Sequence, residues 1–169
     1  MDAIDQLFTL AEISIALAGF AGIIASFQFR QDSHFSRGKI ISLAIIVYVS
    51  LGGAFFAAFP ILLFNFGLSE EDVWKWSSLL IGINQLLITI FVWKNSPIAE
   101  WTSINRFLFI TLFALSSFLA ICNLMNAAGI LFDKSFGIFF AIYMFNLGIV
   151  CLNFAKLLMT PLWRTLKDN

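Results

Sequence analysis

The sequence predicts an all-α integral membrane protein, a polytopic helix bundle with about five transmembrane helices. Hydrophobic residues make up 60% of the 169 residues, 12% are charged, and the mean hydropathy is +0.93. A soluble domain carries about a quarter charged residues, and a disordered chain has low hydrophobicity and high charge. These numbers therefore exclude both classes and leave a membrane protein.

Long runs with few charges delimit the spans. The run 6–29 contains one charge, Glu12, and the runs 40–69, 76–93, 107–132 and 135–155 contain none. A bilayer core about 30 Å thick needs about 20 helical residues. We therefore expect transmembrane helices over residues 6–28, 40–66, 75–93, 105–131 and 136–159. The runs do not alternate polar and apolar residues, as barrel strands would.

The flanks of each run support these helices in order. The first run follows an acidic start, Met1 to Asp5, which differs from the basic start of a secretory signal, so we expect a retained span. The second contains Pro60, which predicts a kink. Tryptophan favours the headgroup level, and all five lie at predicted interfaces of the last three helices: Trp74, Trp76, Trp93, Trp101 and Trp163.

The predicted connections are short, covering residues 31–39, 67–74, 94–104 and 132–135. None can hold a soluble domain. We therefore expect one transmembrane domain over residues 1–169.

The basic residues predict the orientation, because they stay on the cytoplasmic side of short loops. With five spans, eight of the ten cations lie on one side, in the loops after the first and third helices and at the C-terminus. The other side holds only Lys75 and Lys134, with most of the acidic residues. This bias predicts the N-terminus outside and the C-terminus inside.

Several kinds of chemistry lack their usual residues. His34 is the single histidine and lies in a predicted loop, and Cys122 and Cys151 have no metal-binding spacing. No phosphate loop or intramembrane nucleophile motif is present. The net charge is zero, so no overall positive potential attracts duplex nucleic acid. We therefore expect a protein that is not an enzyme and carries no metal and no cofactor.

Glu12 is the single ionisable residue well inside a predicted span. A charge at that depth usually faces a bundle interior or a water path. At about 100° per residue, one stripe of the first helix carries Asp5, Thr9, Glu12, Ala16 and Gly19. This stripe could line an aqueous path in an oligomer, with Glu12 as a cation-selecting ring. Alternatively, the helix begins later and Glu12 lies near the headgroups.

A second stripe of the same helix has a small residue at every fourth position: Ser14, Ala18, Gly22 and Ser26. This pattern lets membrane helices approach closely, so it predicts a helix–helix contact within the chain or between copies.

Amide side chains occur at predicted membrane depth in the last three helices, namely Asn84, Gln85, Asn123, Asn126, Asn146 and Asn153. In lipid they must find hydrogen-bond partners, so they predict a satisfied bundle interior or, alternatively, a substrate site.

Cations on the predicted cytoplasmic side could together bind an anionic or nucleotide ligand: Arg30, Arg37, Lys39, Lys94, Arg106 and Arg164. The alternative is that they set the orientation and contact anionic lipid.

The run from Ala11 to Gly22 resembles the first helix of small, largely uncharacterised bacterial multi-span membrane proteins, with a pattern A-E-x-S/T-x-x-x-A-G-F-x-G. Glu12, Gly19 and Gly22 are matching positions, and the resemblance implies a bacterial inner membrane. The chain is also similar in size and architecture to membrane effectors of antiphage defence, some of which respond to nucleotide signals. Small multidrug transporters share the Ala-Glu pair but have four spans.

We therefore expect an oligomeric channel or pore-forming effector, embedded in lipid, with Glu12 near the conduction path. Two alternatives stay open: a small proton-coupled transporter that uses Glu12, and a non-catalytic subunit that anchors a partner protein.

Overall fold

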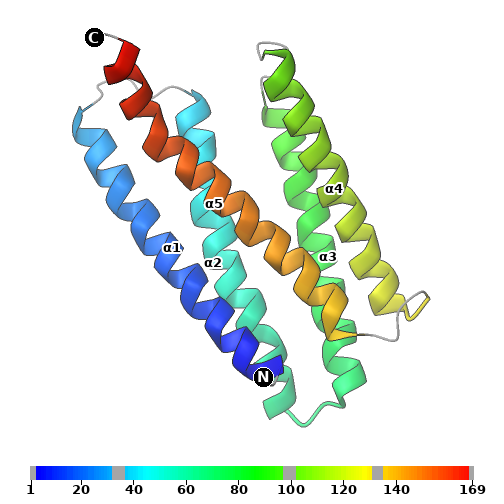
Figure 1. Cartoon of the computed structure of the whole chain (residues 1–169). Coiled ribbons are helices and arrows are strands. Elements are labelled where there is room, and N and C mark those ends of the chain that lie inside the picture. Colours follow the sequence, from blue (N-terminus) through cyan, green and yellow to red (C-terminus); the bar gives the residue numbers. More distant parts are fainter. Residues whose placement is uncertain (1–2, 32–36, 97–101, 131–134, 168–169) are drawn as a thin grey trace. The chain divides into compact units, whose positions relative to one another are not determined.

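The computed structural model describes residues 3–31, 37–96, 102–130 and 135–167. Within these ranges, side chains are described except at 27–31, 37–39, 41, 157 and 160–167. The described residues form five helices: α1 (Ala3–Gln31), α2 (Arg37–Asn65), α3 (Glu70–Asn95), α4 (Ser103–Ala128) and α5 (Phe136–Lys167). All five are long and apolar enough to cross a membrane (Figure 1). The predicted all-helical class with five candidate spans is confirmed.

Helix α3 begins at Glu70, five residues before the predicted start. Ser69 caps it: the Ser69 hydroxyl accepts from the Asp72 amide at 3.2 Å and donates to the Asp72 carboxylate at 2.8 Å. Acidic side chains in a first turn are favourable because they face the positive end of the helix dipole. Hydropathy alone excluded these polar residues from the helix.

Helix α4 ends at Ala128, three residues before the predicted end. Gly129 follows with φ of 66°, a left-handed conformation that favours glycine, and its amide donates to the Asn126 carbonyl at 3.1 Å. Gly67, which lies after the end of α2, is also in the left-handed conformation, with φ of 78°. Helix α5 continues to Lys167, beyond the predicted end at residue 159, and α2 continues through Pro60.

The chain divides into two compact units. Unit 1 comprises residues 1–61 and 144–169, and therefore α1, most of α2 and the later part of α5. Unit 2 comprises residues 62–143, with α3, α4 and the ends of α2 and α5 that adjoin them. The expectation of one transmembrane domain over residues 1–169 therefore stays a prediction.

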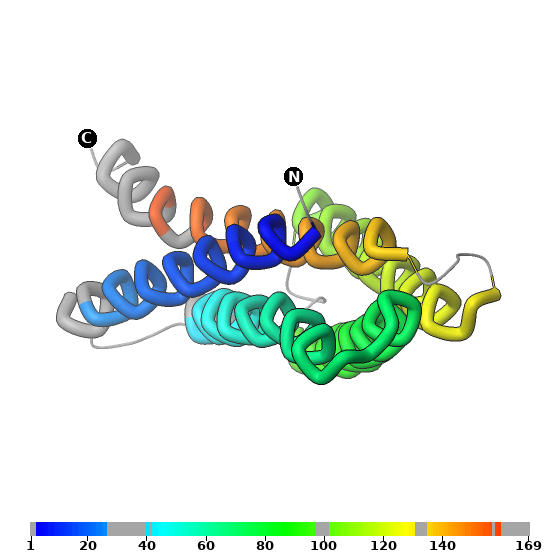
Figure 2. The backbone as a smooth tube through the Cα atoms, turned by 90° about the horizontal axis from the view of Figure 1, so that it is seen from below, coloured from blue at the N-terminus to red at the C-terminus, as the bar shows by residue number. Residues whose placement is uncertain are grey.

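The core of unit 1 joins its three helices at small and β-branched residues. Ala21 of α1, Ile46 of α2 and Val150 of α5 are fully buried together. Partly buried side chains surround them: Leu17, Leu43, Val47, Val49 and Phe154. Figures 1 and 2 show α1 and α2 side by side. This contact leaves the other side of α1 uncovered by the core.

The centre of unit 2 is an antiparallel hairpin of α3 and α4. The helices approach closely at Gly82, where an added Cβ would lie 3.0 Å from a Leu124 methyl carbon and 3.3 Å from the Ala120 carbonyl oxygen. A small residue is therefore required at this crossing.

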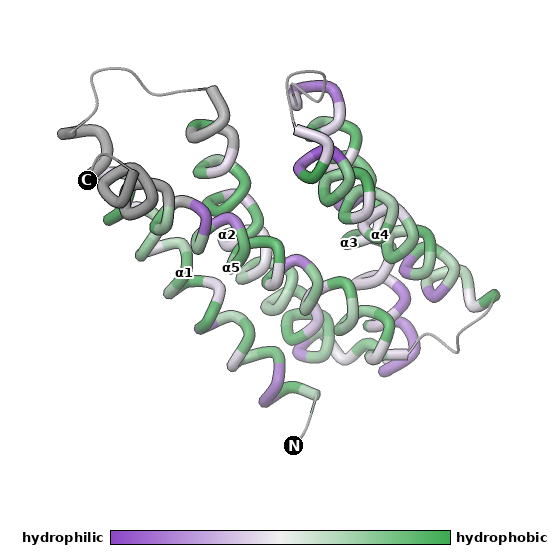
Figure 3. Tube along the Cα trace, turned by 45° about the horizontal axis from the view of Figure 1, so that its top comes forward, coloured by the Kyte–Doolittle hydropathy of each residue, from purple (hydrophilic) through white to green (hydrophobic). Residues whose placement is uncertain are grey.

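The outward faces of both units are strongly apolar. Phe8, Leu87, Phe107 and Phe118 are each more than half exposed. Figure 3 shows hydrophobic residues along most of the length of the described helices. Large contiguous apolar surfaces are rare on soluble proteins, so these faces fit lipid hydrocarbon.

Candidate functional site

The Glu12 stripe lies on the exposed side of α1. Its five members, Asp5, Thr9, Glu12, Ala16 and Gly19, are all exposed. Within residues 3–26 of the helix, the buried positions are Leu7, Leu10, Ser14 and Ala21. At 100° per residue the centres of the two sets lie nearly opposite each other. The carboxylate therefore points away from the core of its own unit.

The position of Glu12 along the helix places it inside the apolar span. The candidate span of α1 covers Ala3–Ser26, and Glu12 is its tenth residue. At 1.5 Å per residue the carboxylate-bearing residue lies about 14 Å from the start of the helix. The helix begins earlier than predicted, at Ala3 rather than residue 6, so a late start does not move Glu12 to the helix end.

The small-residue stripe lies across the edge between the buried and exposed sides of α1. Ser14 is fully buried, Ala18 is half-buried, and Gly22 and Ser26 are exposed. A Cβ added to Gly22 would meet nothing within 4 Å. The Ser26 hydroxyl donates to the Gly22 carbonyl at 2.9 Å. A contact through the whole stripe stays a prediction.

Asn126 connects three helices of unit 2. Its side chain is fully buried. The amide nitrogen donates to the Ser78 hydroxyl at 2.8 Å and to the Ser135 carbonyl at 3.1 Å, and the amide oxygen accepts from the Ser135 backbone N–H at 2.9 Å. Asn126 therefore holds the residue before α5 against the α3–α4 hairpin.

The amide nitrogens of the other two buried amides of the hairpin, Gln85 and Asn123, also have partners. Gln85 donates to the Ser116 hydroxyl at 2.7 Å, and the Thr89 and Ser116 hydroxyls lie 2.8 Å apart. The amide nitrogen of Asn123 donates to the Leu119 and Ile138 carbonyls at 3.1 and 3.2 Å. This pattern favours the bundle-interior interpretation over a substrate site among these amides.

Two buried polar atoms of unit 2, Ser77 Oγ and Asn123 Oδ1, have no hydrogen-bond partner within the described structure. Ser77 lies one turn after Trp74 on the same side of α3, and Trp74 packs against Phe136 of α5. Asn123 faces Ile138 of α5. The Asn123 side chain therefore lies beside the first turn of α5.

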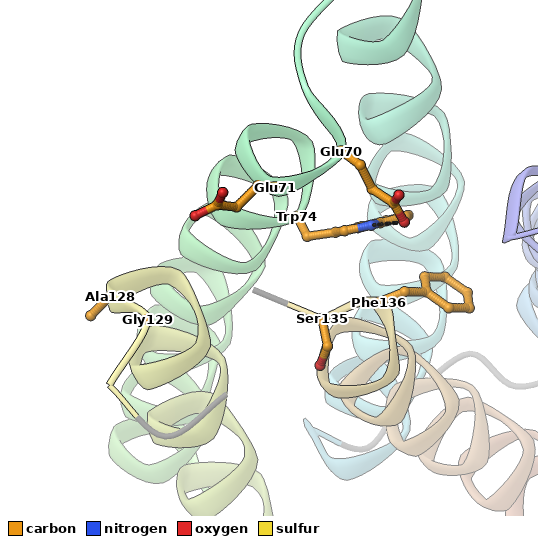
Figure 4. Close-up of a pocket in the computed structure, with 7 residues that line it drawn as sticks. All are labelled: Glu70, Glu71, Trp74, Ala128, Gly129, Ser135 and Phe136. Carbon is orange, nitrogen blue, oxygen red and sulfur yellow. Dashed lines mark hydrogen bonds between the residues drawn. The ribbon is translucent and has the colours of Figure 1, made fainter. Parts of the chain in front are cut away.

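A cleft opens at this end of unit 2, with a volume of about 820 Å³. It is lined by Glu70, Glu71, Trp74, Ala128, Gly129, Ser135 and Phe136 (Figure 4). Glu70 accepts a hydrogen bond from the Trp74 indole at 3.3 Å, and the Trp74 and Phe136 rings lie 4.9 Å apart. Carboxylates and aromatic rings thus meet in one concave site.

Two of the predicted anion-binding cations lie at the opposite end of the hairpin. Lys94 in the last turn of α3 and Arg106 in the first turn of α4 are both exposed. Trp93 beside them packs on Phe109 and Phe113, with ring centres 6.1 and 4.6 Å away. The side chains of the other four, Arg30, Arg37, Lys39 and Arg164, lie outside the described residues, as does His34.

Neither cysteine is in a disulfide: Cys122 is half-buried and Cys151 is exposed. Within the described ranges, no group of three or more His, Cys, Asp and Glu side chains could hold a metal ion.

Comparisons with protein-family models, curated proteins and solved structures found no match to this chain. The candidate sites are therefore argued from their geometry.

Sequence reasoning did not find the cleft. It used Glu70 and Glu71 only as evidence of orientation. The available signal was an acidic run followed directly by a tryptophan, residues 70–74, at the start of an apolar helix. The sequence could not show that Ser135 and Phe136, more than 60 residues later, complete the same site.

Proposed function

We propose that the protein conducts cations as a homo-oligomer in the membrane, with Glu12 of each copy facing a shared aqueous path. One observation carries the proposal: the Glu12 carboxylate is exposed, within an apolar span, on the side of α1 opposite its buried face. A charge facing lipid at depth costs several kcal/mol. A path shared between copies removes this cost, because water and the ring of copies then surround the carboxylate.

The composition of the stripe supports a path rather than a lipid contact. Asp5 and Thr9 precede Glu12 on the same face, and the Thr9 hydroxyl donates to the Asp5 carbonyl at 3.0 Å. Ala16 and Gly19 follow with small side chains. The face thus carries acidic side chains toward the start of the helix and small side chains farther along it. Rings of carboxylates attract cations and repel anions.

The size of the chain also favours a path that several copies form together. Most alternating-access carriers place their site between paired repeats within one chain. Here the described residues of the 169-residue chain form five helices, and the sequence shows no internal repeat. Self-association supplies the additional surface.

The test is the substitution E12Q in proteoliposomes, with D72N as a matched control. Each removes one exposed carboxylate, but Asp72 lies at the capped start of α3. We expect wild-type and D72N vesicles to pass potassium in preference to chloride. The E12Q protein should keep a conductance but lose most of that preference, because the ring is then neutral.

Three results would contradict the proposal: no flux from correctly folded wild-type protein under any voltage, an unchanged selectivity in E12Q, or the same loss in D72N. Loss of proton-driven substrate uptake, with no passive conductance in the wild type, would indicate the transporter alternative instead.

A further inference from the structure

We propose that Thr9 determines which alkali cations pass, because its hydroxyl oxygen in each copy lines the shared path beside the Glu12 ring. This role rests on the proposed conduction path along α1 and belongs to a second residue of the same stripe. Glu12 separates cations from anions, whereas Thr9 separates potassium from the smaller and more strongly hydrated lithium.

The position of Thr9 is the first step. At 1.5 Å per residue, Thr9 lies about 6 Å beyond Asp5 and about 4.5 Å before Glu12 along α1. At 100° per residue, the three side chains fall within about 60° of one another. All three residues are exposed and lie within the candidate span Ala3–Ser26. A cation that travels along this face therefore meets Thr9 between the two carboxylates.

The hydrogen bond of Thr9 determines what its side chain offers to an ion. The Thr9 hydroxyl donates to the Asp5 carbonyl at 3.0 Å, so its one hydrogen is used within the helix. The oxygen can then only accept, and a hydroxyl that donates is polarised into a stronger acceptor. Thr9 thus presents a neutral acceptor oxygen to its surroundings, and oxygens of this kind replace water around a cation.

Thr9 is the single residue of the stripe with a neutral side-chain oxygen. Asp5 and Glu12 carry carboxylates, and Ala16 and Gly19 have no polar side-chain atom. Carboxylates attract cations of every size. Neutral oxygens compensate the loss of water best for a cation that dehydrates easily, which is potassium rather than lithium. Discrimination between alkali cations is therefore expected at Thr9.

The experiment measures reversal potentials of the full chain in planar bilayers, with potassium on one side and lithium on the other. We expect the wild type to prefer potassium. T9V removes the hydroxyl but keeps the β-branched shape. Its potassium-to-lithium permeability ratio should fall at least about threefold, the factor expected for the loss of one neutral polar contact. The preference for potassium over chloride should persist, because the Glu12 ring is intact.

Two further variants are controls. T9S keeps the hydroxyl and should keep the alkali ratio. Thr111 of α4 is also exposed, and its hydroxyl donates to the Phe107 carbonyl at 3.0 Å, so it repeats the local geometry of Thr9 on a helix of unit 2. T111V should therefore leave both preferences within about twofold of the wild type.

The role of Thr9 is overturned if the wild type passes potassium and lithium equally, if T9V keeps the alkali ratio, or if T9S or T111V lowers the ratio as T9V does. An absence of ion flux through T9V protein with normal thermal unfolding would also overturn it, because a selectivity role requires that ions still pass. A wild type that conducts no cations would overturn the proposed function itself.

Discussion

At the scale of single residues, Asn126 shows how a polar side chain can stabilise a helix junction in an apolar protein. Its three hydrogen bonds reach α3 and both backbone groups of Ser135. The substitution N126A would leave the buried Ser78 hydroxyl and the Ser135 backbone without these partners. Of these groups only Ser78 is fully buried, and one unsatisfied buried group costs about 1–3 kcal/mol.

We therefore expect N126A to lower the free energy of unfolding by about 1–3 kcal/mol, measured by denaturant titration in detergent micelles. The control is N95A, because the Asn95 amide donates only to the Phe91 carbonyl within the same helix, at an exposed position. Equal stability of N126A and N95A would show that water replaces the Asn126 bonds.

The Glu12 stripe could be predicted from the sequence because all its members lie on one helix. The 100° rotation per residue decides which side chains share a face. The exposure of that face could not be predicted in the same way. It depends on Ile46 and Val150, residues of other helices, contacting Ala21 on the far side of α1.

At the scale of helices, the exposed stripe of α1 makes a second prediction. If copies associate through it, a cysteine at Ala16 should form a disulfide between protomers in membranes treated with an oxidant. The protein should first carry C122A and C151A, because both native cysteines are free. The comparison position is Leu87 on α3, which is 63% exposed but belongs to unit 2.

We expect A16C to give dimers on non-reducing gels much faster than L87C. Equal rates would indicate random collisions in the bilayer, and no dimers from A16C would contradict a shared face at α1. Either result would weaken the proposed conduction path, because a lone protomer leaves Glu12 facing lipid.

The spans themselves could be predicted because bilayer thickness sets a minimum length for an apolar run. Helix ends follow different physics. Glu70, Glu71 and Asp72 are hydrophilic, yet they extend α3 because acidic residues favour a capped N-terminus. Gly129 ends α4 inside an apolar stretch because it adopts a positive φ. Local backbone chemistry therefore overrides hydropathy at helix ends.

At the scale of the whole molecule, the cleft shows the limit of sequence reasoning. Glu70 and Glu71 attracted attention only as charges, because their neighbours Ser135 and Phe136 come from another helix. Composition and periodicity describe one segment at a time. A site assembled from three helices requires the tertiary fold, here the hairpin of α3 and α4 with the start of α5 held by Asn126.

The orientation of the chain in the membrane is a further prediction at this scale. Eight of the ten cations lie at the end of α1, the start of α2, the end of α3, the start of α4 and the later part of α5, which a five-span chain places on one side. Moving such cations outward is unfavourable, so this side should be cytoplasmic. The cleft, at the other end of α3, would then open outside.

Single cysteines at the two ends of α3 test this orientation in the full chain. In the C122A/C151A background, E71C should react with a membrane-impermeant maleimide in intact cells, and K94C should react only after permeabilisation. Both positions are exposed, so each variant is the control for the other. The reverse labelling pattern would place the cleft inside, and equal labelling of both would indicate a mixture of orientations. Either result would contradict the prediction, because the cation bias would then not determine how the chain inserts.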